Sequence, residues 1–358
     1  MAYTTIDNPE LYFQTKLWTG TGSSNALTLD GSEDMQPDLV WIKGRSQARN
    51  HKMFDPVRGV TKVIGSNETE AETTVATSLT AFGSDGFTVS SDVSVNENTE
   101  TFVAWCWKAG GGSGSSNEDG SINTTLTSVS TTAGFSISKF TVSGSGDETV
   151  GHGLGAKPKF VVVKHLTDAG NWQTYVEGIG TENQQYLQLN DEDALANHSG
   201  LWGAGMTSSV IGIGVDVVVT DGEDCIAYCF AEKQGFSRFG QYTGNGNADG
   251  TFIYTGFRPA FVIFKQTNTT GNWAIIDSTR SYHNVGNHTL ATNSQNAESS
   301  FGGGESVGGA SNKVDLVSNG IKIREASDYN NTSGGTYIYM AFAEQPFVNS
   351  NGVPCNAR

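Results

Sequence analysis

The sequence predicts an all-β protein built from three tandem antiparallel β-sandwich modules. Glycine is frequent, at 45 of 358 residues, and charged residues make up only 16% of the chain, which favours short strands joined by turns. No long stretch carries apolar residues at the helical spacing i, i+3, i+4 and i+7. A block of three sequence signals also recurs three times in the same order, and such self-similarity indicates a modular array.

Each copy of the block has an opener, a Pro-led run and a closing run. The openers are WTGTG (Trp18–Gly22), VSGSG (Val142–Gly146) and YTGNG (Tyr242–Gly246). The Pro-led runs are PDLVWIK (Pro37–Lys43), PKFVVVK (Pro158–Lys164) and PAFVIFK (Pro259–Lys265). The closing runs are TFVAWCWK (Thr101–Lys108), CIAYCFAEK (Cys225–Lys233) and YIYMAFAEQ (Tyr337–Gln345). Continuous apolar runs of this kind are typical of strands that are buried on both faces.

The spacing of these signals predicts the module boundaries. Modules are expected at 1–109, 121–233 and 234–347, with a Gly/Ser linker at 110–120 and a polar tail at 348–358. The composition of the linker predicts a flexible coil without a packing face. The very short junction between the second and third modules predicts that these two sit rigidly together, with the first module set apart as the mounting end.

Further strands and helices are expected inside the modules. Three segments alternate as half-buried strands do after a tight turn, namely Ser84–Ser90, Gly214–Thr220 and Ser318–Arg324. Only residues 65–77 and 184–197 could hold a short helix. About seven or eight strands per module, without crossover helices, predict an antiparallel sandwich.

The charge and the cysteines exclude several classes of protein. A net charge of −16 argues against a nucleic-acid-binding surface and makes Ca²⁺ a candidate bridge, without locating a site. Cys106 and Cys229 fall at one repeat position inside the closing run, where a small buried side chain fits better than a disulfide. Cys225 lies in the same predicted strand, and Cys355 has no evident partner, so free thiols are expected.

Neither a secretory signal nor a bilayer-spanning segment is expected from the sequence. The segment MAYTTIDNPELYF lacks a basic region and an apolar stretch. No apolar run approaches the roughly 20 residues that a membrane helix needs, so no membrane insertion is expected. A virion protein made in the host cytoplasm reconciles these features with the composition, and a secreted protein without its signal peptide is the alternative.

Two Asp–Arg elements are candidate site residues. Asp55 and Arg58 lie in DPVRG of the first module, and Asp277 and Arg280 lie in DSTR of the third. Such a pair could clamp a sugar or an anion, but repeated Asp–Arg pairs mostly hold local geometry, so structural ion pairs are the favoured interpretation. The second module has Glu177 and no Arg in this region.

The aromatic residues and acidic clusters offer other candidates. Trp172 and Trp273 share one repeat position and are expected in the core. Trp202, a unique aromatic residue in a Gly-flanked loop, is the candidate ligand contact. The acidic stretch at 190–193 could bind Ca²⁺ or form a solvated loop. No histidine has metal-ligand spacing and no motif supplies catalytic residues, so no metal site and no enzyme are predicted.

Several of these phrases resemble a repeat-module family common in structural proteins of marine bacteriophages. The phrases are NPELYFQTKLWTGTG, QPDLVWIKGR, DPVRG, SDGF, FVAWCWKAGGG, YTGNG, GFRPAFVIFK and YIYMAFAEQPF. The resemblance covers nearly the whole chain. It implies concanavalin-like or jelly-roll sandwiches, a role in tail fibres or other virion proteins, and no transferable catalytic residues.

The leading hypothesis is therefore a bacteriophage virion protein, a tail fibre or baseplate-associated protein that contacts the host surface. Its expected partners are other virion proteins, a host surface glycan or protein, and further copies of itself, with a trimer as one candidate assembly. A capsid decoration or head-fibre protein is the structural alternative. A tail depolymerase and a secreted lectin are the remaining alternatives.

Overall fold

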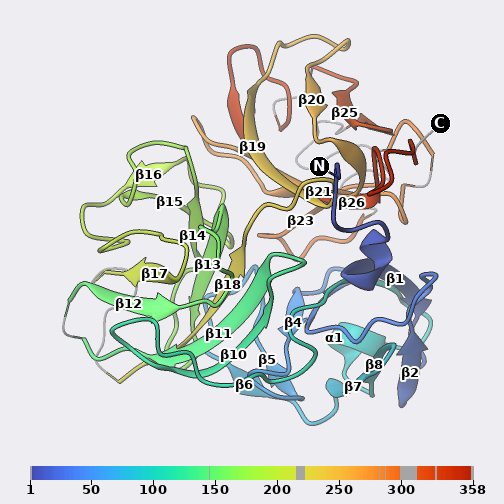
Figure 1. Cartoon of the computed structure of the whole chain (residues 1–358). Helices are drawn as coiled ribbons and strands as arrows, with labels where there is room; N and C mark the ends of the chain where they lie inside the picture. Colours follow the sequence, from blue (N-terminus) through green and yellow to red (C-terminus); the bar gives the residue numbers. More distant parts are fainter. Residues whose placement is uncertain are drawn as a thin grey trace.

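The computed structural model of the chain describes residues 2–144, 146–214, 222–281, 283–286, 288–298, 313–326 and 329–355. Nearly all of its regular structure is strand, and every paired strand is antiparallel to its neighbour. The prediction of an all-β fold is confirmed. Three groups of strands surround a common centre (Figure 1). Residues 1–109, 121–233 and 234–347 are called repeats one, two and three below.

The elements follow the repeats. Repeat one contains η1 (Pro9–Leu11), β1 (Phe13–Thr19), β2 (Asn25–Thr28), β3 (Leu39–Gly44), β4 (Lys52–Phe54), β5 (Lys62–Val63), β6 (Thr73–Thr74), β7 (Leu79–Gly83), β8 (Gly86–Val89), α1 (Val93–Asn96) and β9 (Thr101–Trp107). Repeat two contains β10 (Thr124–Ser130), β11 (Phe135–Thr141), β12 (Glu148–Gly151), β13 (Phe160–His165), β14 (Gln173–Val176), β15 (Gln185–Gln188), β16 (Ala196–Asn197), β17 (Val210–Ile213) and β18 (Asp224–Phe230). Repeat three contains β19 (Ser237–Thr243), β20 (Phe252–Tyr254), β21 (Phe257–Gln266), β22 (Ala274–Asp277), β23 (Leu290–Ala291), β24 (Val314–Val317), β25 (Gly320–Ile323) and β26 (Thr336–Pro346).

The three main sheets share one plan. Their strand orders are β1-β9-β3-β4, β10-β11-β18-β13-β14-β15-β16 and β19-β26-β21-β22-β23. In each sheet the strand of the closing run lies between the opener strand and the Pro-led strand, which explains why all three runs are so apolar. A smaller sheet accompanies each main sheet, β2-β8-β7 in repeat one, β12-β17 in repeat two and β20-β25-β24 in repeat three.

The closing strands β9 and β18 are apolar on both faces because each face meets a different core, whereas both faces of β26 pack in the shared core. In β9, Phe102, Ala104 and Cys106 pack inside repeat one, whereas Trp105 and Trp107 pack in a core shared by all three repeats. Strand β18 alternates in the same way between the core of repeat two and the shared core. Since successive side chains of a strand point to opposite faces, a single run supplies both cores.

The segment at 110–120 is not the flexible linker that its composition predicts. The carboxylate of Asp38 accepts the backbone N–H groups of Ala109, Gly111 and Gly112 at 2.7, 2.7 and 2.8 Å. Ser115 then forms a β-bridge with Thr127. Glycine serves here to let the backbone fold tightly around a buried carboxylate, so repeat one is tied to repeat two.

Two other local predictions need correction. The stretches 65–77 and 184–197 contain the short strands β6, β15 and β16, and the helical turns lie instead at η1 and α1. In repeat one the first residue of the opener, Trp18, pairs with Phe102 of the closing strand. At the same position in repeat two, Cys225 of the closing strand pairs with Phe140, which lies two residues before the VSGSG motif begins. The predicted strand Gly214–Thr220 lies outside the described residues from 215 onward. Neither described helical turn has the length needed to cross a membrane.

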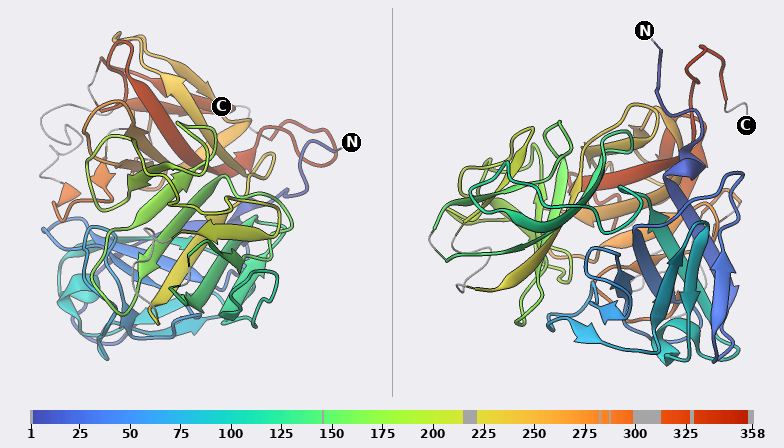
Figure 2. Two further views of the ribbon diagram at one scale, coloured as in Figure 1. Left: turned by 90° about the vertical axis from the view of Figure 1, so that its left-hand side faces the viewer. Right: turned by 60° about the horizontal axis from the view of Figure 1, so that its bottom comes forward.

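The two ends of the chain meet on repeat three. The Asp7 carboxylate accepts the backbone N–H of Ser350 at 2.7 Å, and the Tyr3 hydroxyl donates to the carbonyl of Gly256 at 2.7 Å. Phe13 of β1 stacks on Phe342 of β26 with ring centroids 5.5 Å apart. Both termini lie on the same side of the molecule (Figure 2), and these contacts close the three repeats into a ring.

Candidate functional site

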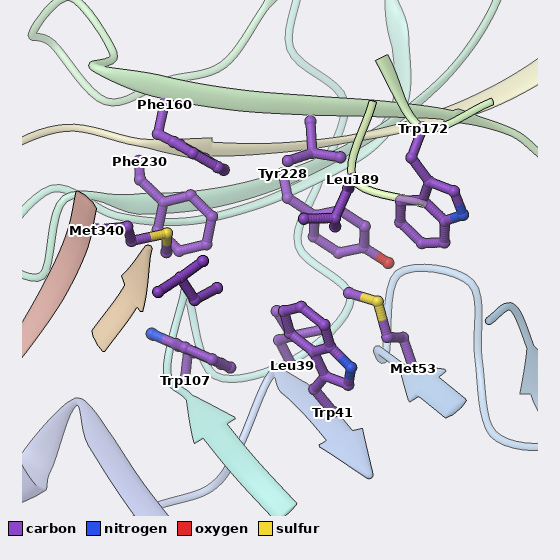
Figure 3. A pocket seen from close by; sticks show the side chains of 12 residues that line it. Leu39, Trp41, Met53, Trp107, Phe160, Trp172, Leu189, Tyr228, Phe230 and Met340 are labelled. Carbon is purple, nitrogen blue, oxygen red and sulfur yellow. The ribbon is translucent and has the colours of Figure 1, made fainter. Parts of the chain in front are cut away.

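The centre of the molecule is an aromatic core to which all three repeats contribute. Trp107 of repeat one lies 6.4 Å from Phe230 of repeat two and 5.3 Å from Phe261 of repeat three, measured between ring centroids. A cavity of about 20 Å³ remains between the repeats (Figure 3). It has apolar walls and room for no more than one water molecule, so this core holds the repeats together and does not bind a ligand.

The lysine that ends each Pro-led run links its repeat to a neighbouring repeat by a hydrogen bond. Each Nζ donates to the carbonyl of the following residue and to a carbonyl in a loop of a neighbouring repeat. The contacts between repeats are Lys43 to Gln295, Lys164 to Thr69 and Lys265 to Glu192, each at 3.1 Å. Repeat one thus holds repeat three, repeat two holds repeat one, and repeat three holds repeat two.

Each of these loop carbonyls also accepts a backbone N–H from the repeat that contacts it. The donors are Arg49 to Gln295 at 2.9 Å, Gly170 to Thr69 at 2.7 Å and Gly271 to Glu192 at 2.7 Å. Burial lowers the pKa of the Lys43 ammonium to about 7 and the pKa values of Lys164 and Lys265 to about 8. Because all three lysines are buried and engaged, their role in the fold is structural.

The two predicted Asp–Arg elements are buried ion pairs at these same interfaces. Arg58 contacts Asp55 at 2.6 Å and Arg280 contacts Asp277 at 2.5 Å, with no exposed side-chain surface on any of the four. Each carboxylate accepts one more hydrogen bond from a neighbouring repeat. The Tyr228 hydroxyl donates to Asp55 at 2.8 Å, and the Trp105 indole N–H donates to Asp277 at 2.9 Å.

The missing pair in repeat two has a physical explanation. Strand registers place Val176 at the position of Asp55 and Asp277. The same registers place Met340 of repeat three at the position of Trp105 and Tyr228. Methionine has no hydrogen to donate, so a buried carboxylate facing it would lack the partner that the other two carboxylates have. The acid and its donor are absent together, and the apolar pair Val176 and Met340 replaces them.

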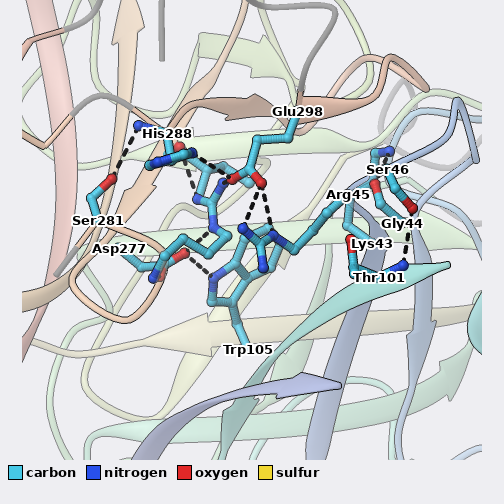
Figure 4. Close-up of polar contacts among 12 residues, drawn as sticks. Lys43, Gly44, Arg45, Ser46, Thr101, Trp105, Asp277, Ser281, His288 and Glu298 are labelled. Atoms are coloured by element: carbon cyan, nitrogen blue, oxygen red, sulfur yellow. Dashed lines mark hydrogen bonds and ion pairs between the residues drawn. The ribbon is translucent and has the colours of Figure 1, made fainter. Parts of the chain in front are cut away.

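A second carboxylate joins the cluster between repeats one and three (Figure 4). Glu298 contacts Arg280 at 2.9 Å and Arg45 of repeat one at 2.7 Å, and the Nδ1 atom of His288 lies 3.6 Å from it. Asp277 and Glu298 therefore both neutralise arginines. A glycosidase needs two carboxyl groups that flank a substrate bond in an accessible site, whereas the Asp277 carboxylate is fully buried, so this cluster serves the interface.

Sequence comparison adds one finding to this geometry. The profile of a domain of unknown function, DUF7483, matches residues 8–346. The chain belongs to the DUF7483 family. The matched range runs from just before η1 to the end of β26, so it spans all three repeats rather than one repeat. No curated protein matches the chain.

Two tryptophans of this DUF7483 domain occupy the core, where the sequence placed them. The Trp172 indole N–H donates to the carbonyl of Gly65 in repeat one at 2.9 Å, and Trp273 donates to Gln188 in repeat two at 2.9 Å. Both side chains are fully buried. They extend the same cyclic set of contacts as the lysines.

Trp202 is a core residue, which corrects the prediction of a surface ligand contact. Its side chain has no exposed surface, its indole N–H donates to the carbonyl of Gln185 at 2.8 Å, and it packs edge-to-face on Tyr175 at 5.8 Å. The flanking glycines Gly200, Gly203 and Gly205 all have positive φ, which lets the chain turn tightly here. Strand β17 passes close to this turn, because a Cβ at Gly212 would lie 1.9 Å from the Trp202 carbonyl oxygen. A Gly-flanked aromatic residue is therefore no sign of exposure here.

His51 is the interface residue that sequence reasoning missed. It follows Asn50, just as Trp172 follows Asn171 and Trp273 follows Asn272. Its ring accepts the Trp41 indole N–H at Nδ1 at 2.8 Å, so Nε2 is the nitrogen that donates to the carbonyl of Ala291, also at 2.8 Å. Burial lowers the pKa of His51 well below its usual value. The preceding Asn was the signal that aligned His51 with the two tryptophans.

The remaining candidate groups are the acidic stretch and the cysteines. Among the described residues, no three His, Cys, Asp or Glu side chains gather as metal ligands. In the acidic stretch 190–193 the Asn190 side chain accepts the Trp172 backbone N–H at 2.8 Å, and the Glu192 carbonyl is the acceptor of Lys265. The four cysteines are free thiols, with Cys106, Cys225 and Cys229 buried.

Proposed function

We propose that this protein is a structural virion protein of a bacteriophage, a tail-fibre or baseplate-associated component that contacts the host surface. The resemblance of its repeat phrases to virion modules supports the class of protein. The observation that supports a binding rather than a catalytic role is that the repeated charged residues form contacts between the repeats. The carboxylates of the Asp–Arg pairs and the three repeated lysines all form hydrogen bonds between the repeats.

The architecture supports a rigid unit that carries surface loops. Hydrogen bonds pass from every repeat to a neighbour, and one aromatic core joins all three, so relative motion of the repeats would break many buried contacts at once. Recognition loops on such a scaffold are held in fixed relative positions. A net charge of −16 makes a polyanionic partner such as nucleic acid unfavourable.

A capsid decoration or head-fibre protein is the second candidate. The observation that favours it is the closed body with both chain ends on one side, which suits a knob attached through its termini. The two roles predict different positions on the virion and different effects on infection.

Labelling and competition experiments separate the two roles. Gold-labelled antibody against the protein should decorate the tails of phage particles, and the purified protein should bind host cells saturably and slow phage adsorption. Labelling on the head without competition would establish the decoration role instead. Absence of the protein from purified particles would overturn both.

A further inference from the structure

One open groove lies where the two chain ends meet the junction between repeats two and three. It consists of two adjoining cavities of about 200 and 620 Å³, which share Tyr3 and Gln234. Arg238 and Tyr254 line the smaller cavity, and Ser350 lines the larger one. We call it the junction groove. Its volume is in the range of ligand sites, unlike the enclosed central cavity.

The groove carries an aromatic residue that the fold does not require. Tyr254 of β20 is 52% exposed, and its neighbour on the same strand face, Phe252, is 46% exposed. The strand registers pair Tyr254 with Gly320 in repeat three and Thr28 with Gly86 in repeat one, so Tyr254 replaces a threonine and Phe252 replaces Ala26. Since repeat one forms the same strand with small side chains, the fold does not need a ring at position 254, and the exposed Tyr254 in the groove points to an intermolecular contact.

The polar wall of the groove is also particular to repeat three. Arg238 pairs with Glu232 at 2.8 Å, and both side chains keep exposed surface. The registers place Gln14 and Ser136 at the position of Arg238 in the other two repeats. On the opposite side the Tyr3 hydroxyl lies 3.4 Å from the Tyr254 hydroxyl. The groove therefore combines two tyrosines, one balanced ion pair and the Gln234 side chain.

We propose that the junction groove binds a neutral saccharide unit of a bacterial surface polysaccharide. Tyrosine rings offer apolar faces to the C–H groups of a sugar ring, and their hydroxyls offer hydrogen bonds. The Arg238–Glu232 pair presents both donors and acceptors to sugar hydroxyls without a net charge. A purely apolar peptide would leave these polar groups unpaired, and a polyanion would meet the Glu232 carboxylate. The inference rests on the proposed host-contact role and names its site.

The test uses two substitutions that repeat one itself supplies. Tyr254→Thr removes one of the two rings that line the groove, and Phe252→Ala removes a similarly exposed ring of the same strand that does not line it. Both substitutions install residues that this strand carries in repeat one, so both variants should fold, and thermal unfolding verifies this. Arg238→Gln, which installs the residue of repeat one at that position, removes the polar wall.

The full-length protein and each variant are applied to an array of neutral and acidic bacterial oligosaccharides, and the strongest glycan is then titrated by calorimetry. We expect a neutral glycan to bind the parent protein and Phe252→Ala alike, and Tyr254→Thr and Arg238→Gln to bind it roughly tenfold or more weakly. Equal affinity of all variants, loss on Phe252→Ala, or absence of any glycan binding would overturn the inference. Virion labelling tests the broader proposal separately, because it does not depend on glycan binding.

Discussion

Tyr228→Phe tests how much the hydrogen bond between Tyr228 of repeat two and Asp55 of repeat one stabilises the protein. The substitution removes only the hydroxyl that donates to the buried Asp55 carboxylate at 2.8 Å. Burial raises the pKa of Tyr228 well above its usual value, so this hydroxyl remains a donor. The change is nearly isosteric and leaves no large cavity. A hydrogen bond to a charged group contributes roughly 1.5–3 kcal/mol, and Asp55 keeps Arg58 as a partner, so we expect the free energy of unfolding to fall by about 1.5 kcal/mol.

Tyr242→Phe is the matched control for this experiment. The Tyr242 hydroxyl donates at the same distance, 2.8 Å, to the neutral carbonyl of Asn330 within repeat three. Its loss should cost less, about 1 kcal/mol. Urea denaturation followed by tryptophan fluorescence measures both variants against the parent protein. The reasoning is refuted if Tyr228→Phe costs no more than Tyr242→Phe, because the contact between the repeats would then contribute nothing beyond an ordinary neutral hydrogen bond.

Three further predictions concern other buried groups. The unfolded chain binds more protons than the folded one between the lowered pKa values of Lys43, Lys164 and Lys265 and their ordinary value of 10.5. The free energy of unfolding should therefore rise as pH increases through about 7 to 8, by at most about 1.4 kcal/mol per pH unit for each lysine. The rise should be less steep in the Lys265→Met variant. A urea midpoint that stays constant or falls over this pH range contradicts the prediction. His51→Trp should destabilise the protein by about 1–3 kcal/mol through overpacking against Trp41. Trp41→Val in the same chain should restore most of the loss in a thermal melt, because the registers place Val162 and Ile263 at the position of Trp41 in the repeats that carry Trp172 and Trp273 at the position of His51. A double variant that is no more stable than His51→Trp argues against this equivalence. Burial raises the pKa of the Cys106, Cys225 and Cys229 thiols. A disulfide reagent should therefore modify Cys355 quickly in the native protein and the other three cysteines only after denaturation. Rapid reaction of more than one thiol in the native protein would show that the cores open.

The sequence is informative wherever one local pattern has one structural cause. The apolar closing runs predict buried strands, and they are the central strands β9, β18 and β26. The burial of Trp172 and Trp273 follows from their shared position. Each of these predictions depends on periodicity or repetition, which survive without knowledge of the tertiary contacts.

The predictions that failed depend on contacts between distant segments. The glycines and serines at 110–120 predict a flexible coil, because no local pattern shows that the distant Asp38 carboxylate accepts hydrogen bonds from the backbone N–H groups at this point. The sequence predicts that Trp202 is exposed in a loop, because its hydrogen bond to Gln185 and its packing on Tyr175 are tertiary contacts that the local sequence does not show. The junction groove could not be predicted at all, since its wall joins Tyr3 to Tyr254 across most of the chain.

The interlocked repeats change how the protein can be dissected. The linker suggested that residues 1–109 form a separable mounting end, but their removal would expose the shared aromatic core. It would also leave Lys164 without its Thr69 acceptor and Tyr228 without Asp55. A truncated chain that fails to enter virions would then report on folding rather than on attachment. Repeat-derived substitutions avoid this difficulty, because each installs a residue already accommodated at the same strand position elsewhere in the molecule. In a chain with three copies of one plan, a surface difference between copies points to a function of that copy, and one such difference is the exposed Tyr254 of strand β20 in the junction groove.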